Sequence, residues 1–463
     1  MASVSGIEVE FSGTALGDKR RSLRVLEVVR ALDVNPSMSF PKAMGNDAAL
    51  EGTYRLLNNP EVGAAELLAP HHRATAERIS ALPAVVIAHD TTSLDFNGSG
   101  RSGLGPTSRG GQGFFAHISL ALTGDEARLP LGVLASKTWV RTGKKPKIRP
   151  EMRSHDPERE SKRWFEQVAA AQGRVPNEVR AIHVMDREGD AYELLSRMHA
   201  GKLGFVVRAA HDRRVLGDLP MLSDVLGALK QECEREVPLS RRIGSSMPRG
   251  RAQHPPRHSR VARLAFSASR VEFERPRYAL KELLPSISLN VVHVTEVDPP
   301  PGEKPVEWIL FTSESIASVA DILRVVDVYR ARWVIEEFFK ALKTGCAIEE
   351  RELESFHALE NALALFVPIA WRLLLLRNLS RQSGDVAANV ALTTTQLEVL
   401  RAVSKKPLSA APTAREALLA IAALGGHIKN NGDPGWQVLA RGYHDLLLLE
   451  VGWLARGPRC DQS

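Results

Sequence analysis

The apolar residues of the N-terminal stretch recur with helical spacing. Between residues 16 and 70 the pattern is helical, as at Leu23, Leu26 and Val29. This spacing predicts a helical N-terminal domain, residues 1–70. The first helix begins with a basic cluster of Lys19, Arg20, Arg21 and Arg24. Such a cluster is typical of a DNA-binding surface, but an ordinary solvated helix face, which is the commoner case, has the same composition.

The middle of the chain changes to β-type patterning. Apolar runs at 83–96, 114–123 and 129–140 predict three strands. The chain continues with a helix at 160–171, a strand that passes through Asp186 into a helix over 179–198, and a strand at 203–210. Strands that alternate with helices after a run of antiparallel candidates predict a mixed α/β core.

Two further stretches complete the predicted organisation. Residues 211–305 interrupt the alternation with prolines, arginines and two strand-like runs, which indicates a β-rich insertion with a loop. We therefore predict an α/β domain over residues 71–380 that contains this insertion. After Leu353 the pattern is almost wholly helical, with a break at 405–412, and residues 381–463 form a predicted C-terminal helical domain.

Charge is distributed unevenly along the 463 residues. Lys and Arg outnumber Asp and Glu by 61 to 54, which gives a net charge of +7 and a pI near 9.3. Six basic residues and no acids occupy 137–149, and seven arginines and no acids occupy 237–263. Tracts of one sign favour a phosphate-rich partner, although a solvated loop explains each tract equally well.

Cysteine content and terminal patterning bear on the compartment. Three widely spaced cysteines predict no disulfide framework and no CxxC zinc site, so a reducing compartment is expected. The first residues lack the basic start and apolar middle of a signal peptide. The longest apolar run, 362–371, is shorter than the roughly 20 residues that span a bilayer. We therefore expect a cytoplasmic protein without a membrane partner.

Residues 329–343 place an unusual set of side chains on one helical face. At about 100° per residue, five polar residues share a stripe about 80° wide: Tyr329, Arg332, Glu336, Lys340 and Lys343. The apolar residues of the same segment occupy the opposite, buried side. Three cations around one acid suit a surface that grips phosphates while Glu336 contacts a metal. A solvated stripe is the equally weighted alternative.

Two aspartates favour the functional interpretation of that stripe. Asp90 and Asp186 each close an apolar β-run, and carboxylates at strand ends can converge with a third acid from a helix. Three converging carboxylates require divalent cations, and oxygen ligands favour Mg²⁺ or Mn²⁺. Two such ions support in-line displacement at phosphorus. We assign the neighbouring Asp95 and Asp190 to local capping or surface roles.

The chain resembles the DDE transposases of insertion-sequence family four. The family's Tyr-x2-Arg-x3-Glu-x6-Lys signature matches Tyr329, Arg332, Glu336 and Lys343 without a gap, and HDTTSL and DREGD are similar to the motifs of its two catalytic aspartates, here Asp90 and Asp186. The likeness covers nearly the whole chain. ALGDKRR and EGTYRLLNNP resemble the family's N-terminal DNA-binding segment, and AIAALGGHIKNNGDPGW resembles its C-terminal dimerisation segment.

This resemblance implies a fold and roles for individual residues. The implied fold is a ribonuclease H-like (retroviral integrase-like) core with a β-rich insertion, flanked by helical domains. Arg332 and Lys343 would hold DNA phosphates near the cleavage point, and Tyr329 would contact a neighbouring phosphate. Lys340 and Arg208 match further basic residues near the family's active site. Trp308 matches a family tryptophan that stacks on an extruded base. A strand tryptophan is more commonly part of the core.

The resemblance implies that the chain is a DNA transposase and endonuclease, whose activity is cut-and-paste transposition. Strand cleavage at the transposon ends, hairpin formation and resolution, and strand transfer would use two Mg²⁺ ions per site, with Mn²⁺ able to substitute. The partners would be the terminal inverted repeats, the target DNA and a second copy of the chain, in the nucleoid-containing cytoplasm of a bacterium. Three features depart from the family: a short segment before ALGDKRR, Gly189 in place of a frequent alanine, and His89, for which we expect no metal ligation.

Other functions fit parts of this pattern. A catalytically silent derivative could bind DNA ends or inhibit an active copy, and a metal-dependent nuclease could cut without joining. Paired carboxylates also hydrolyse glycosides, but the basic tracts and 6% aromatic content make a sugar-binding cleft a poor explanation.

Overall fold

The chain forms two compact units in the computed structural model. Unit 1 comprises Met1–Pro146, Gln167–Arg180 and Trp333–Ser463, and unit 2 comprises Lys147–Glu166 and Ala181–Arg332. The structure describes residues 6–96, 98, 100–108, 110–142, 159–239, 256–381, 386–428 and 433–455. Most of the two acid-free basic tracts, residues 143–150 and 240–255, lies outside the described residues.

Unit 1 begins with the helices that the sequence predicts. They are η1 (Ile7–Phe11), α1 (Lys19–Val34), α2 (Phe40–Met44), α3 (Asp47–Asn58) and α4 (Ala64–Ser80). Helix α1 starts at its N-cap Asp18, whose side chain accepts a hydrogen bond of 2.8 Å from Arg20 N. Its buried face includes Val25 and Leu32, whereas Leu23 is 50% exposed, so the helix is confirmed but Leu23 lies off its core face.

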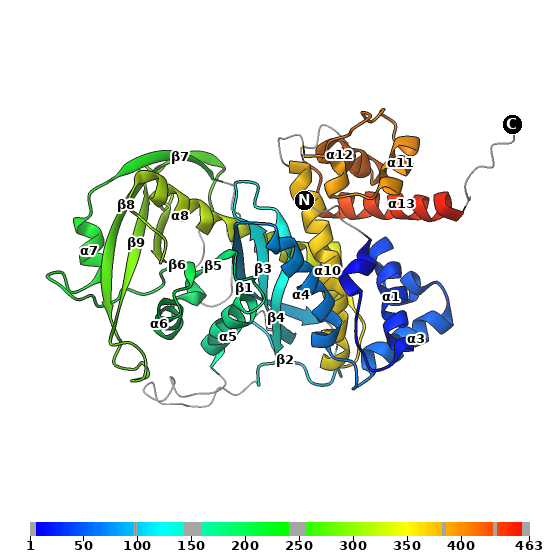
Figure 1. Cartoon of the computed structure of the whole chain (residues 1–463), viewed down its shortest axis with the longest axis horizontal. Coiled ribbons are helices and arrows are strands. Elements are labelled where there is room, and N and C mark those ends of the chain that lie inside the picture. Colours follow the sequence, from blue (N-terminus) through cyan, green and yellow to red (C-terminus); the bar gives the residue numbers. More distant parts are fainter. Residues whose placement is uncertain are drawn as a thin grey trace. The chain divides into compact units, whose positions relative to one another are not determined.

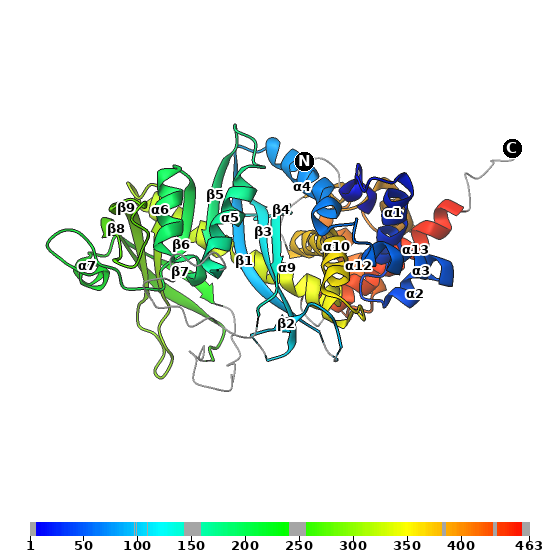
Figure 2. The same ribbon diagram turned by 90° about the horizontal axis from the view of Figure 1, so that it is seen from below.

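Antiparallel strands follow in the same unit. Strand β1 (Ala84–Phe96) pairs with β3 (Gln112–Thr123), and β3 also pairs with β4 (Pro130–Trp139) and the short β2 (Gly105–Pro106). Figure 2 shows β1, β3 and β4 side by side. All three long strands were predicted, and nearly every residue of β3 is buried, as expected for a strand covered on both faces.

Helix α10 (Phe356–Arg381) is the central core helix of unit 1. It packs against α3, α4 and β4, as Figure 1 shows for α4 and β4. The prediction that no segment is long enough to span a bilayer was wrong as to length, because Phe356–Leu379 forms 24 helical residues with a mean hydropathy of 1.6. An 18-residue apolar stretch of this helix is 94% buried within the protein, as in the core helix of a globular domain.

The predicted C-terminal helices are also present. They are α11 (Thr394–Val403), α12 (Ala414–Leu424) and α13 (Trp436–Ala455), preceded by η6 (Ala388–Val390). Thr393 and Thr413 begin α11 and α12 with capping boxes, in which Gln396 and Glu416 return the hydrogen bond to the cap. The predicted break at 405–412 lies between these two helices, so this expectation is confirmed.

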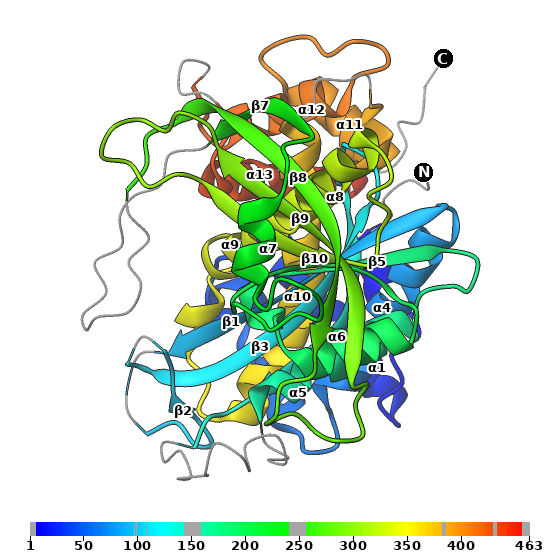
Figure 3. The ribbon, with the colours of Figure 1, turned by 90° about the vertical axis from the view of Figure 1, so that its left-hand side faces the viewer.

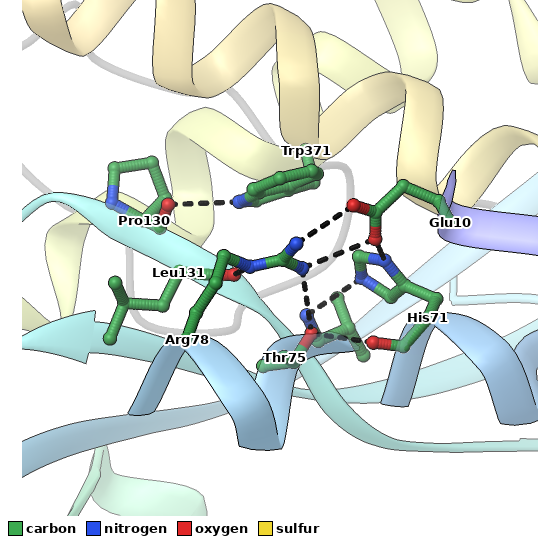
Figure 4. A network of polar contacts seen from close by, with 8 residues as sticks. Glu10, His71, Thr75, Arg78, Pro130, Leu131 and Trp371 are labelled. Atoms are coloured by element: carbon green, nitrogen blue, oxygen red, sulfur yellow. Dashed lines mark hydrogen bonds and ion pairs between the residues drawn. The ribbon is translucent and has the colours of Figure 1, made fainter. Parts of the chain in front are cut away.

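A buried polar network joins four elements of unit 1, which are η1, α4, β4 and α10 (Figure 4). Glu10 on η1 accepts hydrogen bonds of 2.8 and 3.1 Å from Arg78 on α4 and lies 2.5 Å from Nδ1 of His71. Arg78 Nε donates to the Leu131 carbonyl of β4, and its guanidinium lies 4.2 Å from the ring centroid of Trp371 on α10. One buried carboxylate therefore fixes the N-terminal segment to α4, β4 and α10.

Unit 2 has a mixed sheet with its own helices. Its sheet strands are β5 (Arg180–Met185), β6 (Gly204–Arg208), β7 (Cys233–Leu239), β8 (Arg260–Glu274), β9 (Ser286–Glu296) and β10 (Glu307–Thr312). Strands β5 and β6 are parallel, whereas the pairs β6–β10, β10–β9, β9–β8 and β8–β7 are antiparallel. The long β8 and β9 lie side by side in Figure 3.

The helices of this part of the chain follow the sheet connections. They are α5 (Glu160–Gln172), in which the boundary between the units falls, α6 (Tyr192–Ala200), α7 (Leu222–Ala228) and α8 (Val319–Ala331). Helix α8 packs on β6, β8 and β9 and starts at Ser318, whose hydroxyl accepts a hydrogen bond from Asp321 N. The stretch 211–305, predicted to be β-rich, contains β7, β8 and β9.

Candidate active site

Asp90 lies inside strand β1 and not at its end. The strand continues to Phe96, and Asp90 pairs in register with Ile118 of β3. The expectation that Asp90 closes a strand was therefore wrong. What changes at Asp90 is burial: the strand is fully buried from Val85 to His89 and partly exposed from Asp90 to Ser93. Asp90 Oδ1 accepts a hydrogen bond of 2.8 Å from Thr91 N.

The histidines beside Asp90 belong to the buried face of β1 and β3. His89 shares a hydrogen bond of 3.0 Å with Ser119, and His117 shares one of 2.9 Å with Thr91. Burial lowers the pKa of His117 to about 3, so its imidazole is neutral at physiological pH. Buried, hydrogen-bonded histidines thus lie beside Asp90, whose own side chain is partly exposed.

Asp186 occupies the position that the sequence predicted for it. Strand β5 ends at Met185, and Asp186 is the N-cap of the short helix η3 (Arg187–Gly189). Its Oδ1 accepts a hydrogen bond of 2.8 Å from Glu188 N, and the side chain is partly exposed. Gly189 packs its backbone against Met185, where an added Cβ would come within 2.7 Å of the Met185 side chain. A larger residue at position 189 would push the turn away from strand β5.

Asp190 differs from its expected capping or surface role. It is 4% exposed and accepts hydrogen bonds from the backbone N–H groups of Ala210 and His211, at 2.6 and 3.0 Å. Arg213 adds a buried ion pair. Asp190 therefore holds the segment after β6, a role that the sequence did not indicate because Arg213 lies 23 residues away.

Glu336 lies on α9 (Trp333–Lys340), which packs against β1 within unit 1. The strand of Asp90 and the helix of Glu336 are thus packed elements of one unit. Glu336 is partly exposed, whereas Ile335 and Phe338 are buried, as predicted for the opposite face. Asp186 belongs to unit 2, so the three acids are distributed over both units.

The signature residues do not form one continuous α-helical stripe. Helix α8 ends at Ala331, Arg332 N bonds Tyr329 O in a tighter i to i+3 turn, and residues Ala341–Gly345 form the π-helix η4. Spacing at 100° per residue does not hold through such changes of winding. The solvated stripe that was the alternative interpretation does not hold for two of its members, because Tyr329 is 1% exposed and Arg332 is 5% exposed.

Lys340 and Lys343 leave the end of α9 in different environments. Lys340 is exposed, whereas Lys343 in the π-helix is half-buried. Lys343 Nζ donates a hydrogen bond of 2.5 Å to the Ser93 carbonyl and forms an ion pair of 3.2 Å with Glu349. Glu349 also accepts a hydrogen bond from Asp95 N. Lys343 is thereby tied to the strand that carries Asp90.

Trp308 and Arg208 come from neighbouring strands of unit 2. Trp308 on β10 is partly exposed, and its ring centroid lies 5.9 Å from that of Tyr329. Arg208 ends β6 opposite Leu310, and its Nη2 donates a hydrogen bond of 3.0 Å to the Glu307 carbonyl. The structure therefore brings Trp308, Tyr329 and the β6–β10 pair into one region of unit 2.

The basic start of α1 is locally paired. Arg20 bonds Asp18 at 3.1 Å, Arg24 bonds Glu27 at 2.7 Å, and Arg21 forms an ion pair with Glu61. Exposed pairs of this kind contribute about 0–1 kcal/mol, so a phosphate can displace the carboxylate at little cost.

Carboxylates dominate the candidate cation ligands. Within the ranges that the structure describes, no group of three or more His, Cys, Asp or Glu side chains is placed to hold a metal ion. The donor chemistry of Asp90, Asp186 and Glu336 is oxygen only, which fits a hard divalent cation such as Mg²⁺ or Mn²⁺. Convergence of all three on shared ions stays a prediction.

Two family models match parts of the chain. Residues 5–62 match a model described as transposase DNA-binding, and residues 178–368 match a model described as transposase DDE domain. These matches support a DDE transposase. The first match contains the basic start of α1, and the second contains Asp186, Glu336 and the whole Tyr329–Lys343 signature. Asp90 precedes the second match.

The match also gives the fold and the general chemistry of the transposase. A DDE domain implies a ribonuclease H-like fold, in agreement with the mixed sheet, the α/β order and the helices at both ends of the chain. DDE domains are nucleases and strand transferases that generally use divalent metal ions, and the DNA-binding domain makes DNA their partner.

Proposed function

We propose that this chain is a cut-and-paste transposase of the insertion-sequence-four type, with residues 211–305 as an insertion in its ribonuclease H-like core. The observation that carries the proposal is the DDE match over 178–368 around Asp186 and Glu336. The packing of α9 on β1 adds Asp90, because it brings the strand of that acid against the helix of Glu336. The proposed reaction order is end cleavage, hairpin formation and opening, and strand transfer.

Asp90, Asp186 and Glu336 are the proposed ligands of two Mg²⁺ ions, for which Mn²⁺ can substitute. When bound, the ions would supply an activated nucleophile and neutralise charge on the leaving oxygen. Each carboxylate sits on a secondary-structure element, so the ligand positions are set by packing: Asp90 by the β1–β3 register, Asp186 by its N-cap hydrogen bond, and Glu336 by the buried face of α9.

The proposed DNA contacts fall into two groups. Lys340, Lys343, Arg332, Tyr329 and Arg208 would hold phosphates near the cleaved bond, and Trp308 would stack on an extruded base. Tyr329 and Arg332 are buried, so their contact with phosphate requires a side-chain or helix movement on DNA binding. Arg20, Arg21 and Arg24 would bind the terminal repeat through its backbone.

A second copy of the chain is the proposed partner in synapsis. The last two turns of α13 expose large apolar side chains: Leu448, Leu449, Val451, Trp453 and Leu454, each at least 40% exposed. Large apolar side chains exposed around the end of a helix favour burial against another protein surface. We place this assembly on DNA in the bacterial cytoplasm.

A plasmid cleavage and joining assay tests the proposal. The substrate carries the inverted repeats that flank the gene, and the protein is supplied with Mg²⁺ or Mn²⁺. Wild type is expected to release the flanked segment and join it to target DNA. Asp90→Asn is expected to bind the repeat without cutting it.

Asp95→Asn is the matched control. It removes a carboxylate from the same strand, five residues further on, whose contacts are to Ser93 and Thr107. This variant is expected to cut and join. Binding without cutting by wild type would identify a silent derivative, and cutting without joining would identify a nuclease. Either result contradicts the proposed transposase.

A further inference from the structure

Arg351 is a buried cation held by backbone carbonyls from two distant segments. It is 2% exposed and follows the short helix η5 (Ile348–Glu350). Its Nη1 donates to the Met38 carbonyl, and its Nη2 donates to the carbonyls of Pro36 and Cys346. The guanidinium also lies 5.5 Å from the ring centroid of Phe40 and 4.5 Å from that of Phe366. Two fixed nitrogens thus reach three carbonyl groups at once.

The two segments that Arg351 joins have different functions. Pro36 and Met38 lie between α1 and α2, inside the transposase DNA-binding match. Cys346 directly follows the π-helix, and its N–H closes that turn on the Ala341 carbonyl at 2.8 Å. Both segments belong to unit 1. Arg351 therefore connects the DNA-binding domain to the winding of the turn that contains Lys343.

The same stretch continues the connection to β1. Glu349, two residues before Arg351, pairs with Lys343 and accepts the N–H of Asp95. Lys343 in turn donates to the Ser93 carbonyl, three residues from Asp90. Residues 349–351 thus contact the DNA-binding domain through Arg351 and the strand of a candidate catalytic acid through Glu349.

Burial of the Arg351 guanidinium costs free energy, which a residue that only filled space would not require. Burial lowers the pKa of Arg351 to about 10, which reflects the cost of removing a guanidinium from water. An apolar residue of similar volume avoids that cost and commonly gives equal or greater stability. The planar fork of arginine, by contrast, is suited to fixing several acceptors in one geometry, which lysine cannot do with a single nitrogen.

We propose that Arg351 is a positioning residue that sets the distance between the bound transposon end and the catalytic turn at Ala341–Gly345. This inference rests on the proposed function. The DNA-binding domain holds the end, Arg351 fixes that domain to the turn, and the phosphodiester that reaches Glu336 and Lys343 is thereby selected. We call the hydrogen bonds of Arg351 to the carbonyls of Pro36, Met38 and Cys346 the clamp. Loss of the clamp leaves binding of the transposon end intact and makes the position of cleavage less exact.

Cut-site mapping with Arg351→Lys tests this role. The probe is a duplex that carries the terminal repeat and its flanking sequence. The variant is expected to bind it with nearly wild-type affinity, because its DNA-binding surface is unchanged. Cleavage at the wild-type bond, measured with saturating DNA, is expected to fall on the order of 10- to 100-fold, with new cuts at neighbouring bonds. An unchanged single cut site at an unchanged rate would overturn the proposal.

Arg401→Lys is the matched control. Arg401 is an exposed arginine on α11 that also donates to a backbone carbonyl, that of Ala410. This substitution is expected to change neither the rate nor the cut site. If Arg351→Lys does not fold, Phe40→Leu replaces it, because that change keeps all the hydrogen-bond donors and removes one ring beside the guanidinium. Phe40→Leu is expected to add a few cuts at bonds next to the wild-type site, and cleavage at the wild-type bond alone would contradict the proposal.

Hydrogen exchange separates this inference from the proposed function, because it requires no cleavage. In Arg351→Lys the amide of Cys346 is expected to exchange at least about tenfold faster than in wild type or Arg401→Lys, together with the amides of residues 37–40. Unchanged exchange at Cys346 would overturn the clamp even if wild type cuts DNA. Faster exchange with a wild type that does not cut would support the clamp and reject the transposase.

Discussion

Glu10 and Glu336 are the same residue type in opposite environments of unit 1. Glu10 is 4% exposed, and Arg78 and His71 contact both of its oxygens (Figure 4). Burial alone would raise the pKa of Glu10, but the hydrogen bond with His71 and the charge of Arg78 lower it to about 2. Glu336 is partly exposed on a helix that packs against the strand of Asp90.

The difference shows how an acid in this protein can be assigned a role. A carboxylate enclosed by donors on three elements stabilises the fold and has little capacity for a cation. A partly exposed carboxylate keeps part of its surface open to solvent, so a cation can reach it. The same contrast holds in unit 2, where Asp190 is buried against Arg213 and its neighbour Asp186 is partly exposed. Four substitutions or changes of condition sharpen this comparison.

The largest effect is expected at the partly exposed acid. Glu336→Gln should reduce Mg²⁺-dependent end cleavage by at least about 10³-fold, because a ligand of the proposed ions is lost. The thermal midpoint should change little, since the Glu336 side chain is partly exposed. Cleavage rates and thermal melts of the same preparation measure both quantities. A variant that melts earlier and cleaves normally would reverse the assignment.

The buried acid should show the opposite result. Glu10→Gln removes the charge that Arg78 and buried His71 face, so unfolding free energy should fall by about 3 kcal/mol. Urea denaturation measures the loss. Glu27→Gln, in an exposed pair with Arg24, is the control and should change stability by less than about 1 kcal/mol. Cleavage per folded Glu10→Gln molecule is expected to match wild type.

Acid should destabilise the buried region through histidines that stay neutral in the folded state. Burial lowers the pKa of His72 and of His117 to about 3, so in the folded state both resist protonation while the unfolded chain takes up protons near pH 6.5. Stability is therefore present above pH 6.5 and is lost as pH falls toward 3. Each histidine should cost about 2 kcal/mol between pH 7 and pH 5.

Urea midpoints across that pH range check this sign. His72→Phe keeps a ring of similar size and cannot take up a proton, so its stability should depend less steeply on pH than that of wild type. An equal slope in the two proteins would mean that His72 is not neutral in the folded state.

The smallest effect is expected on the exposed surface of α1. Arg20→Gln should weaken binding to the terminal repeat a few-fold and reduce the slope of log affinity against log salt by about 1, because one phosphate contact is lost. Stability should not change, since the pair with Asp18 is exposed. Filter binding at several salt concentrations measures the slope, and an unaltered slope would place the DNA elsewhere on the domain.

The fold was predictable from sequence where local patterning decides it. Strands β1, β3 and β4 and helix α5 lie within a few residues of their predicted bounds, and the C-terminal region is helical with the predicted break, because each carries its own periodicity, caps or turn residues. Asp186 was placed correctly for the same reason, since a β-run ends there and a helix begins. Asp90 was not, because the strand continues past it with partly exposed residues that resemble a loop.

Long-range contacts account for what patterning missed. The turn at Arg332 and the π-helix at Ala341–Gly345 change the helical winding, and the second is held by contacts of Lys343 with Ser93 and Glu349. The burial of Asp190 depends on Arg213, and the clamp depends on carbonyls more than 300 residues from Arg351. None of these partners is specified by neighbouring residues.

The sequence by itself determined the kind of chemistry available: two aspartates and a glutamate in order, a Tyr-Arg-Glu-Lys spacing, and helical segments at both ends. Tertiary structure decided which charges are enclosed and which stay available, and which backbone segment each buried cation fixes. The physical reason is that side-chain type sets what a group can bind, whereas burial and pairing depend on residues brought together only by packing.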